Sequence, residues 1–333
     1  MAQLSVAVVV ATRNRPASLG RLIDGLLAQS RRPDEILIID DGQLPDDRLA
    51  DWQSRCQSAG VKWVYQRKDR PGRSASRNLA AGLTACDTVC FLDDDCEPAA
   101  SCLERLLDGL AALGRWQMPS LPGPPNQPRP PIQPTSPNQP SAAFVAIEPM
   151  VIPPGGVRLG DRAFGALLRI SGYWGLARVA GPKKLGDRIQ ARPVLGGVCL
   201  VYRDALAATQ FDVSLSHSED RDWSVRLSRL PALGRLGCAT DAVCLHHVDP
   251  VGRPGAAAVG ARIARNYISC QGKLFGWRGT ALAFVTLTAM AAGELVLGLV
   301  GCATLRKAGP GYLAMALGTI GGMFSPTGRR ADE

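Results

Sequence analysis

The residues in this sequence best suited to metal chemistry are three consecutive aspartates, Asp93, Asp94 and Asp95. They directly follow residues 88–92, an apolar run typical of a buried strand. Neighbouring carboxylates in a partly buried position repel one another and raise each other's pKa. A divalent cation that prefers oxygen ligands, Mg²⁺ or Mn²⁺, relieves that repulsion. Because side chains alternate along a strand, we expect Asp93 and Asp95 on one side and Asp94 on the other. An acidic surface turn is the alternative.

Four other polar clusters could supply ligands or a proton acceptor: Thr12–Arg15, Asp40-Asp41, Glu219-Asp220 and His246-His247. Glu219 and Asp220 stand at the start of a predicted helix over residues 220–230, where the helix dipole favours ionised carboxylates. Acids at helix starts are also common caps. The two histidines end a predicted strand over residues 241–247, and adjacent histidines there are equally typical of a polar surface.

The apolar pattern of the N-terminal third predicts the elements that position these clusters. Short apolar runs over residues 4–11, 35–39, 61–65 and 88–92 predict strands, and helical spacing separates them. Strands that alternate with helices at this pace predict an α/β fold with a doubly wound, mostly parallel sheet and helices on both faces. Ligands of such sheets bind at the carboxyl ends of the strands, where these polar clusters fall.

The middle of the chain changes character. Residues 119–140 contain ten prolines, which predicts a polyproline-like loop or disordered insert rather than a helix or central strand. Further on, residues 194–201 predict a strand interrupted by Gly196 and Gly197. These glycines permit close approach of a bound acceptor or sugar, or form a simple bulge.

The C-terminal region combines basic and apolar segments. Residues 251–280 carry five basic side chains and no acid, and residues 280–305 are almost wholly apolar, with Glu294 as the only charge. A segment of that length would cross a hydrocarbon core of about 30 Å. Because a glutamate in the bilayer is costly, an interfacial hairpin with the second apolar run at 313–324 is an alternative, as is a buried soluble helix pair. We predict contact with a membrane surface.

Bulk composition narrows the class of protein. Hydrophobic residues make up 46% and charged residues 20% of the 333-residue chain, which is enough for a packed core. The net charge of +9 suggests an anionic partner, but aromatic residues are only 5% and do not alternate with the basic ones, so we expect no nucleic-acid partner. Ten scattered cysteines without a Cys-x-x-Cys pair predict reduced thiols in a catalytic domain on the cytoplasmic side.

Three N-terminal segments, in this order and spacing, resemble the nucleotide-binding half of family 2 glycosyltransferases, which have a GT-A fold: ATRNRPASLGRLIDGLLAQSRRPDEILIIDDG, GRSASRNLAAGL and FLDDDCEP. The later segments GGVCLVYRDAL and FDVSLSHSEDRDWSVRL resemble acceptor-side motifs of that family. We therefore expect four regions: a nucleotide-sugar-binding half (1–115), a Pro-rich insert or loop (116–160), an acceptor-binding half (161–250) and membrane-associated C-terminal helices (251–333).

The resemblance also implies roles for single residues. Thr12, Arg15 and Asp41 correspond to positions that hold the base and ribose, and Arg77 to a basic residue near the nucleotide. Asp93 and Asp95 are the ends of a DxD motif, which contact the ribose and the metal respectively. His246 corresponds to a histidine that approaches the metal, although His247 fits almost as well.

On the acceptor side, Asp220 corresponds to the catalytic base. Gly197, Glu219 and Trp223 belong to the same motifs, and Trp223 either lines the acceptor pocket or packs in the core.

The resulting hypothesis is an inverting, metal-dependent glycosyltransferase that uses Mg²⁺ or Mn²⁺ and a nucleotide-sugar donor. Its expected acceptor is a cell-envelope or lipid-linked glycan, at the inner face of the cell membrane. One alternative is a nucleotidyltransferase, although a Gly-rich phosphate loop followed by lysine is missing near the first strand. The other is a catalytically silent nucleotide-sugar-binding module.

Overall fold

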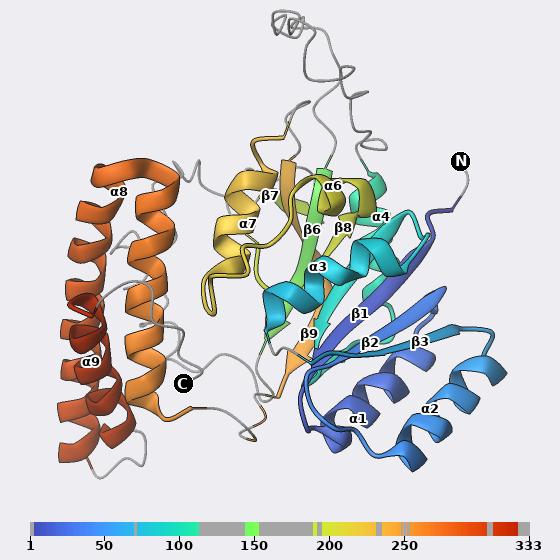
Figure 1. Ribbon diagram of the computed structural model, residues 1–333, viewed down its shortest axis with the longest axis horizontal. Coiled ribbons are helices and arrows are strands. Elements are labelled where there is room, and N and C mark those ends of the chain that lie inside the picture. Colours follow the sequence, from blue (N-terminus) through green and yellow to red (C-terminus); the bar gives the residue numbers. More distant parts are fainter. Residues whose placement is uncertain are drawn as a thin grey trace, which may run out of the picture.

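The computed structural model describes residues 3–69, 72–112, 144–152, 189–191, 195–230, 235–247, 249, 251, 254–304 and 309–325. Within these ranges a nine-stranded sheet in the order β3-β2-β1-β4-β8-β6-β9-β5, with β7 paired to β9, forms the centre of the molecule (Figure 1). Helices cover this sheet, and two further helices form a bundle beside it. The fold is therefore mixed α/β, as the sequence predicts.

The N-terminal strands form the parallel part of the sheet. These are β1 (Val6–Thr12), β2 (Glu35–Asp40), β3 (Lys62–Arg67) and β4 (Thr88–Asp93). β1 and β2 pair in parallel, as do β2 and β3, and β1 and β4. Almost every side chain of β1, β2 and β4 is buried, which explains why these strands have continuous apolar sequences rather than alternating ones.

The helices of this half follow from right-handed crossovers. The helices α1 (Pro16–Leu27) and α2 (Asp46–Ser58) connect β1, β2 and β3 and contact each other, whereas α3 (Arg73–Leu83) returns the chain to β4 and contacts α6. The strand order changes direction at β1 and β4, so the carboxyl ends of these two strands border a crevice in which such sheets bind ligands.

The second half extends the sheet mainly by antiparallel pairing. The strands are β5 (Cys96–Pro98), β6 (Phe144–Ile152), β7 (Ile189–Ala191), β8 (Cys199–Tyr202) and β9 (Arg235–His246). The helices are α4 (Cys102–Ala111), α6 (Arg203–Ala208) and α7 (Glu219–Leu227). Among the pairs in this half, only β6 and β9 run parallel. Parallel pairing, which the sequence predicts for most of the sheet, thus describes its N-terminal part.

Two sequence-based boundaries need correction. β6 (Phe144–Ile152) lies inside residues 116–160, which we predicted to be an insert or loop, yet it pairs with both β8 and β9 near the centre of the sheet. We missed this apolar strand because it directly follows the proline-rich segment and was included in the predicted insert. The prolines at 119–140 themselves lie outside the described residues. The predicted strand at 194–201 shortens to β8 (Cys199–Tyr202), because the glycines precede it.

The C-terminal bundle consists of α8 (Ala256–Ala303) and α9 (Gly309–Met323). Gly276 breaks α8 with φ 64° and ψ −153°, and the helix folds back on itself into two antiparallel segments (Figure 1). Glycines make the contacts close: Gly260 faces the backbone of α9, and Gly318 faces the backbone of Ala257. Among the described residues, α8 is the one helix long and apolar enough to cross a membrane, by length and composition.

Candidate functional site

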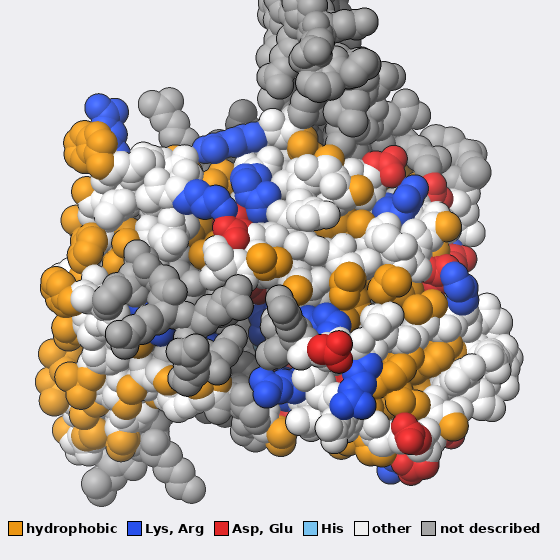
Figure 2. Space-filling model, in the orientation of Figure 1, with side chains coloured by type: hydrophobic (Ala, Val, Ile, Leu, Met, Phe, Trp, Pro, Cys, Tyr) orange, Lys and Arg blue, Asp and Glu red, His pale blue; other side chains and the backbone are white. Residues whose placement is uncertain are grey.

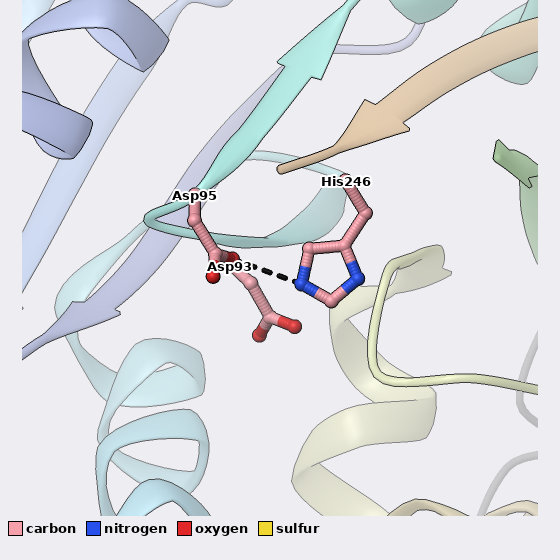
Figure 3. A group of neighbouring side chains, drawn as sticks. All are labelled: Asp93, Asp95 and His246. Carbon is pink, nitrogen blue, oxygen red and sulfur yellow. Dashed lines mark ion pairs between the residues drawn. The ribbon is translucent and has the colours of Figure 1, made fainter. Parts of the chain in front are cut away.

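Three potential metal ligands converge at the carboxyl end of β4. Asp93 is the last residue of β4, Asp95 lies in the turn between β4 and β5, and His246 is the last residue of β9. Antiparallel pairing of β5 with β9 places Cys96 opposite His246, which brings the imidazole back to the turn. One ligand atom from each of the three residues lies within 4.8 Å of the others (Figure 3). The predicted metal residues are therefore neighbours in space.

Asp95 is the most firmly held member of this group. It is 2% exposed, and its Oδ1 lies 3.0 Å from Nε2 of His246. Its Oδ2 accepts a hydrogen bond from the backbone N–H of Asp249 at 2.9 Å. These contacts fix the carboxylate before any ion is bound, which lowers the entropic cost of binding one. The role of Asp249 could not be inferred from sequence, because its backbone rather than its side chain makes the contact.

The structure distinguishes the two histidines. Nε2 of His246 faces Asp95, whereas Nε2 of His247 lies 2.6 Å from a carboxylate oxygen of Glu97 on β5. His246 is thus the histidine next to the aspartates, and His247 points toward a surface carboxylate.

Asp94 shares a cation with Asp95, because Nη1 of Arg15 lies 3.0 Å from Oδ1 of Asp94 and 3.7 Å from Oδ2 of Asp95. Asp94 and Asp95 belong to a turn rather than a strand. Asp94 is 4% exposed, and its side chain faces the end of β1. Its Oδ2 accepts a hydrogen bond from Thr12 Oγ1 at 2.8 Å, and its Oδ1 one from Arg15 at 3.0 Å. Burial raises the pKa of Asp94, and the contacts with Thr12 and Arg15 oppose that rise.

Thr12 and Arg15, which the resemblance assigns to the nucleotide, therefore also have partners inside the protein. Thr12 is 3% exposed, and the Arg15 guanidinium donates to the carbonyl oxygen of Val251 with Nε at 2.9 Å. Arg15 thereby links the start of α1 to the segment that follows β9. Their assignment to base and ribose remains a prediction.

Asp41 lies at the end of β2 and connects it to α3. Its carboxylate pairs with Lys68 at 2.8 Å, accepts a hydrogen bond from the backbone N–H of Gly72 at 2.8 Å, and accepts another from Ser76 at 3.2 Å. Asp40 beside it is fully buried and holds the following turn through the backbone N–H of Gly42. Asp41 is therefore the less buried member of this pair, and its carboxylate joins the end of β2 to α3.

Arg77 connects the two halves of the site. Its guanidinium lies 3.3 Å from Oε1 of Glu219 and 3.7 Å from Oδ1 of Asp93, and donates a hydrogen bond to the carbonyl oxygen of Gly197 at 3.1 Å. A Cβ atom on Gly197 would come within 2.6 Å of the guanidinium, so glycine is required there for Arg77 to keep its position. The neighbour observed beside Gly197 is thus the Arg77 guanidinium, and approach of an acceptor or sugar to this glycine stays a prediction.

Asp220 stands in the first turn of α7, beside Glu219. Burial, followed by the charge of Glu219, raises the pKa of Asp220 to about 6, and Arg77 acts in the opposite direction. Ser218 immediately before this pair has a left-handed backbone (φ 62°), which is unusual for a residue with a side chain and sets the direction in which the helix begins. A carboxylate with a pKa near neutrality is suited to accept a proton.

Trp223 lies in the core rather than in a pocket. Its side chain is 0% exposed, its indole N–H donates to the carbonyl oxygen of Thr209 at 2.6 Å, and its ring stacks on Phe211 at 4.5 Å. The acceptor-side role that we assigned to Trp223 is therefore wrong in this conformation, and packing is its observed role. The tryptophan belongs with Phe211 to the main hydrophobic core.

Comparisons with known proteins agree with this geometry. Residues 7–116 match the model of the family described as Glycosyl transferase family 2. A search of curated sequences found no match. Among solved structures, the chain is similar to the mannosyltransferase PcManGT from Pyrobaculum calidifontis, in complex with GDP-Man and Mn²⁺, with 15% identity, a TM-score of 0.55, and 97% of this chain and 88% of that chain covered.

Two further structures have the same fold. GalNAc-T7 with UDP, GalNAc and Mn²⁺ aligns with a TM-score of 0.54 and 17% identity over 88% of this chain and 51% of that one. TarS 1-349 from S. aureus aligns with a TM-score of 0.51 and 11% identity over 96% and 81%. At these identities, structural similarity shows the fold, while the family match supplies the enzyme class. Residues 7–116 therefore match glycosyl transferase family 2, the described residues have the GT-A fold, and together these findings support a glycosyltransferase.

Proposed function

We propose that this enzyme transfers a sugar from a nucleoside diphosphate donor to a hydroxyl acceptor in one displacement, with inversion at the anomeric carbon. The observation that carries the proposal is the convergence of Asp93, Asp95 and His246 at the carboxyl end of β4 within the family 2 match. Asp220 supplies the proton acceptor that a single displacement requires.

The three side chains fit a divalent metal ion. Two carboxylates and one imidazole offer oxygen and nitrogen ligands, a set that suits Mn²⁺ and leaves coordination positions for a diphosphate. Asp93 faces the crevice with a side chain that is 27% exposed, whereas Asp95 is buried and held by its neighbours. When bound, such an ion would stabilise negative charge on the departing nucleoside diphosphate. We propose Asp95 and His246 as ligands, and Asp93 as a residue shared between the ion and the ribose.

The donor nucleotide would bind along the crevice beside β1 and β2. Thr12 is the last residue of β1, Arg15 directly precedes α1 and Asp41 directly follows β2. These three residues therefore lie at the same edge of the sheet as Asp93, the last residue of β4. Because Asp94 holds Thr12 and Arg15 in place, we propose that it shapes the nucleotide site indirectly.

Asp220 would accept the proton of the acceptor hydroxyl as its oxygen attacks the anomeric carbon. An alcohol is a weak nucleophile, and a nearby carboxylate removes the proton as the new bond forms. Since attack and departure of the nucleoside diphosphate occur on opposite faces of the sugar, the configuration inverts and no covalent enzyme intermediate is needed. Glu219 is 5% exposed and paired to Arg77, so we assign it to support of the base rather than to proton transfer.

We further propose that the C-terminal bundle rests on the inner face of the cell membrane. The second segment of α8 and α9 expose large apolar side chains, including Val296, Leu299 and Leu317 at 57%, 56% and 69%. Figure 2 shows hydrophobic side chains gathered over this end of the molecule. Glu294 is the one acidic residue in α8 and α9, and it is fully buried against Thr319. An acceptor delivered at a membrane would be a lipid-linked or cell-envelope glycan.

A donor panel tests the proposed reaction. Purified protein is incubated with Mn²⁺ or Mg²⁺, UDP-, GDP- and dTDP-sugars and a membrane lipid extract, and the released nucleotide is identified by chromatography. We expect nucleoside diphosphate release that requires the metal and rises with the extract, and a product whose anomeric proton shows inversion by NMR. Release of pyrophosphate would instead indicate a nucleotidyltransferase, and nucleotide binding without turnover would indicate a silent module.

A further inference from the structure

Arg77 is placed where a nucleotide could not easily reach it. The residue lies on α3 and is 3% exposed. Its guanidinium lies over the rings of Phe91, at 5.6 Å, and Phe211, at 5.2 Å. Phe211 in turn stacks on the fully buried Trp223. A buried cation enclosed by aromatic rings is held rigidly, because the rings stabilise the charge and leave little space for another rotamer.

The polar contacts of Arg77 join three segments far apart in sequence. Nη2 donates to the carbonyl oxygen of Gly197, just before β8, and lies 3.7 Å from Asp93 at the end of β4. Nη1 lies 3.3 Å from Glu219 at the start of α7. Asp93 belongs to the candidate metal group and Glu219 directly precedes the candidate base, so one guanidinium sets the distance between the two.

Charge explains why this bridge is needed. Asp93 and Glu219 are acids on facing elements, and both would repel each other and a bound diphosphate without a cation between them. Arg73 also lies near Glu219, at 3.6 Å, and the charges of Asp93 and Glu219 raise the pKa of Arg73, but its side chain is 59% exposed. Arg77 is therefore the cation that fixes geometry, because its planar fork makes several directed contacts at once.

We propose that Arg77 is a positioning residue that locks the metal site to the segment carrying the base, rather than a nucleotide-binding residue. The inference rests on the proposed glycosyl transfer. This role differs from the nucleotide contact that the family resemblance suggests for Arg77, because the guanidinium already contacts Asp93, Glu219 and the carbonyl oxygen of Gly197. Loss of the bridge would disturb the alignment of acceptor and donor while leaving the nucleotide contacts in place.

The test separates turnover from donor binding. Arg77→Lys keeps the charge but loses the fork, and Gly197→Ala keeps the arginine but displaces it, because the added methyl group would lie 2.6 Å from Nη2. For each variant we would measure kcat with the donor that is active in the wild type, and the Kd of the corresponding nucleoside diphosphate with Mn²⁺ by calorimetry. Arg48→Lys, on the exposed side of α2, is the matched control. Circular dichroism and thermal unfolding confirm that each variant is folded.

We expect kcat to fall by about tenfold or more in both variants, with Kd within about threefold of the wild type, and no change in the control. A Kd raised about tenfold or more with kcat nearly unchanged would show that Arg77 binds the nucleotide, and would overturn the inference alone. If the wild type itself transfers no sugar, the proposed function fails and the inference falls with it. Should Arg77→Lys not fold, Gly197→Ala decides between these outcomes.

Discussion

The acid limb of the pH profile is a direct consequence of the proposed base, because a carboxyl group must be deprotonated to accept a proton. Burial and Glu219 raise the pKa of Asp220 to about 6. A general base works only when deprotonated, so activity must rise with pH through that value. A pKa of about 6 leaves about nine-tenths of Asp220 deprotonated at pH 7 and about one-tenth at pH 5. We therefore expect kcat to fall about tenfold between pH 7 and pH 5.

The assay is nucleoside diphosphate release at saturating donor, Mn²⁺ and acceptor over that pH range. In Asp220→Asn, kcat should fall by about a hundredfold to ten-thousandfold and lose its acid limb, because no titrating base remains. Asp204→Asn is a suitable control, since that carboxylate is 66% exposed and pairs with its neighbour Arg203. A wild-type kcat that stays constant from pH 7 to pH 5, or an Asp220→Asn variant with near-normal turnover, would show that another group accepts the proton.

Three further predictions concern the metal, the membrane and the core. Asp95→Ala should abolish Mn²⁺-dependent binding of nucleoside diphosphate in calorimetry, and an unchanged affinity would remove Asp95 from the metal site. Val296→Asp should weaken binding to anionic vesicles about tenfold or more in sedimentation, by removing an apolar contact and adding a like charge. Val213→Asp, at an exposed valine of the catalytic part (66% against 57% for Val296), should not weaken it. Equal binding by the wild type and both variants would place the membrane contact elsewhere. Trp223→Ala should lower the free energy of unfolding by about 3–5 kcal/mol in urea titration, because the indole is fully buried, and a loss below about 1 kcal/mol would contradict its place in the core.

Much of the fold of the N-terminal half could be predicted, because short stretches of sequence there specify each strand. β1, β2 and β4 are buried on both faces, so their apolar runs mark them directly. The polar clusters fall at strand ends, and parallel strands bring such ends to one edge. The convergence of Asp93 and Asp95 with His246 follows less directly, since it needs the antiparallel pairing of β5 with β9, which no local pattern specifies.

Other features could not be predicted from the sequence pattern, because they depend on how residues far apart in the chain pack together. The sequence left two roles open for Trp223, and only the stacking on Phe211 shows that it faces the core. Likewise, the apolar pattern over residues 280–305 did not show how that segment joins the preceding basic one, whereas the positive φ of Gly276 folds α8 back on itself there. Strand alternation predicts a direction for the Asp94 side chain, but it does not predict its hydrogen-bond partners, Thr12 and Arg15.

The central claim is that Asp93, Asp95 and His246 hold the metal ion that the transfer requires. Anomalous diffraction from crystals grown with Mn²⁺ and a nucleoside diphosphate tests it most directly. We expect a manganese peak within coordination distance of Asp95 and His246, in contact with the diphosphate. This peak should be missing from crystals of the Asp95→Ala variant. A manganese ion bound elsewhere, or a diphosphate ordered at this site without any ion, would contradict it.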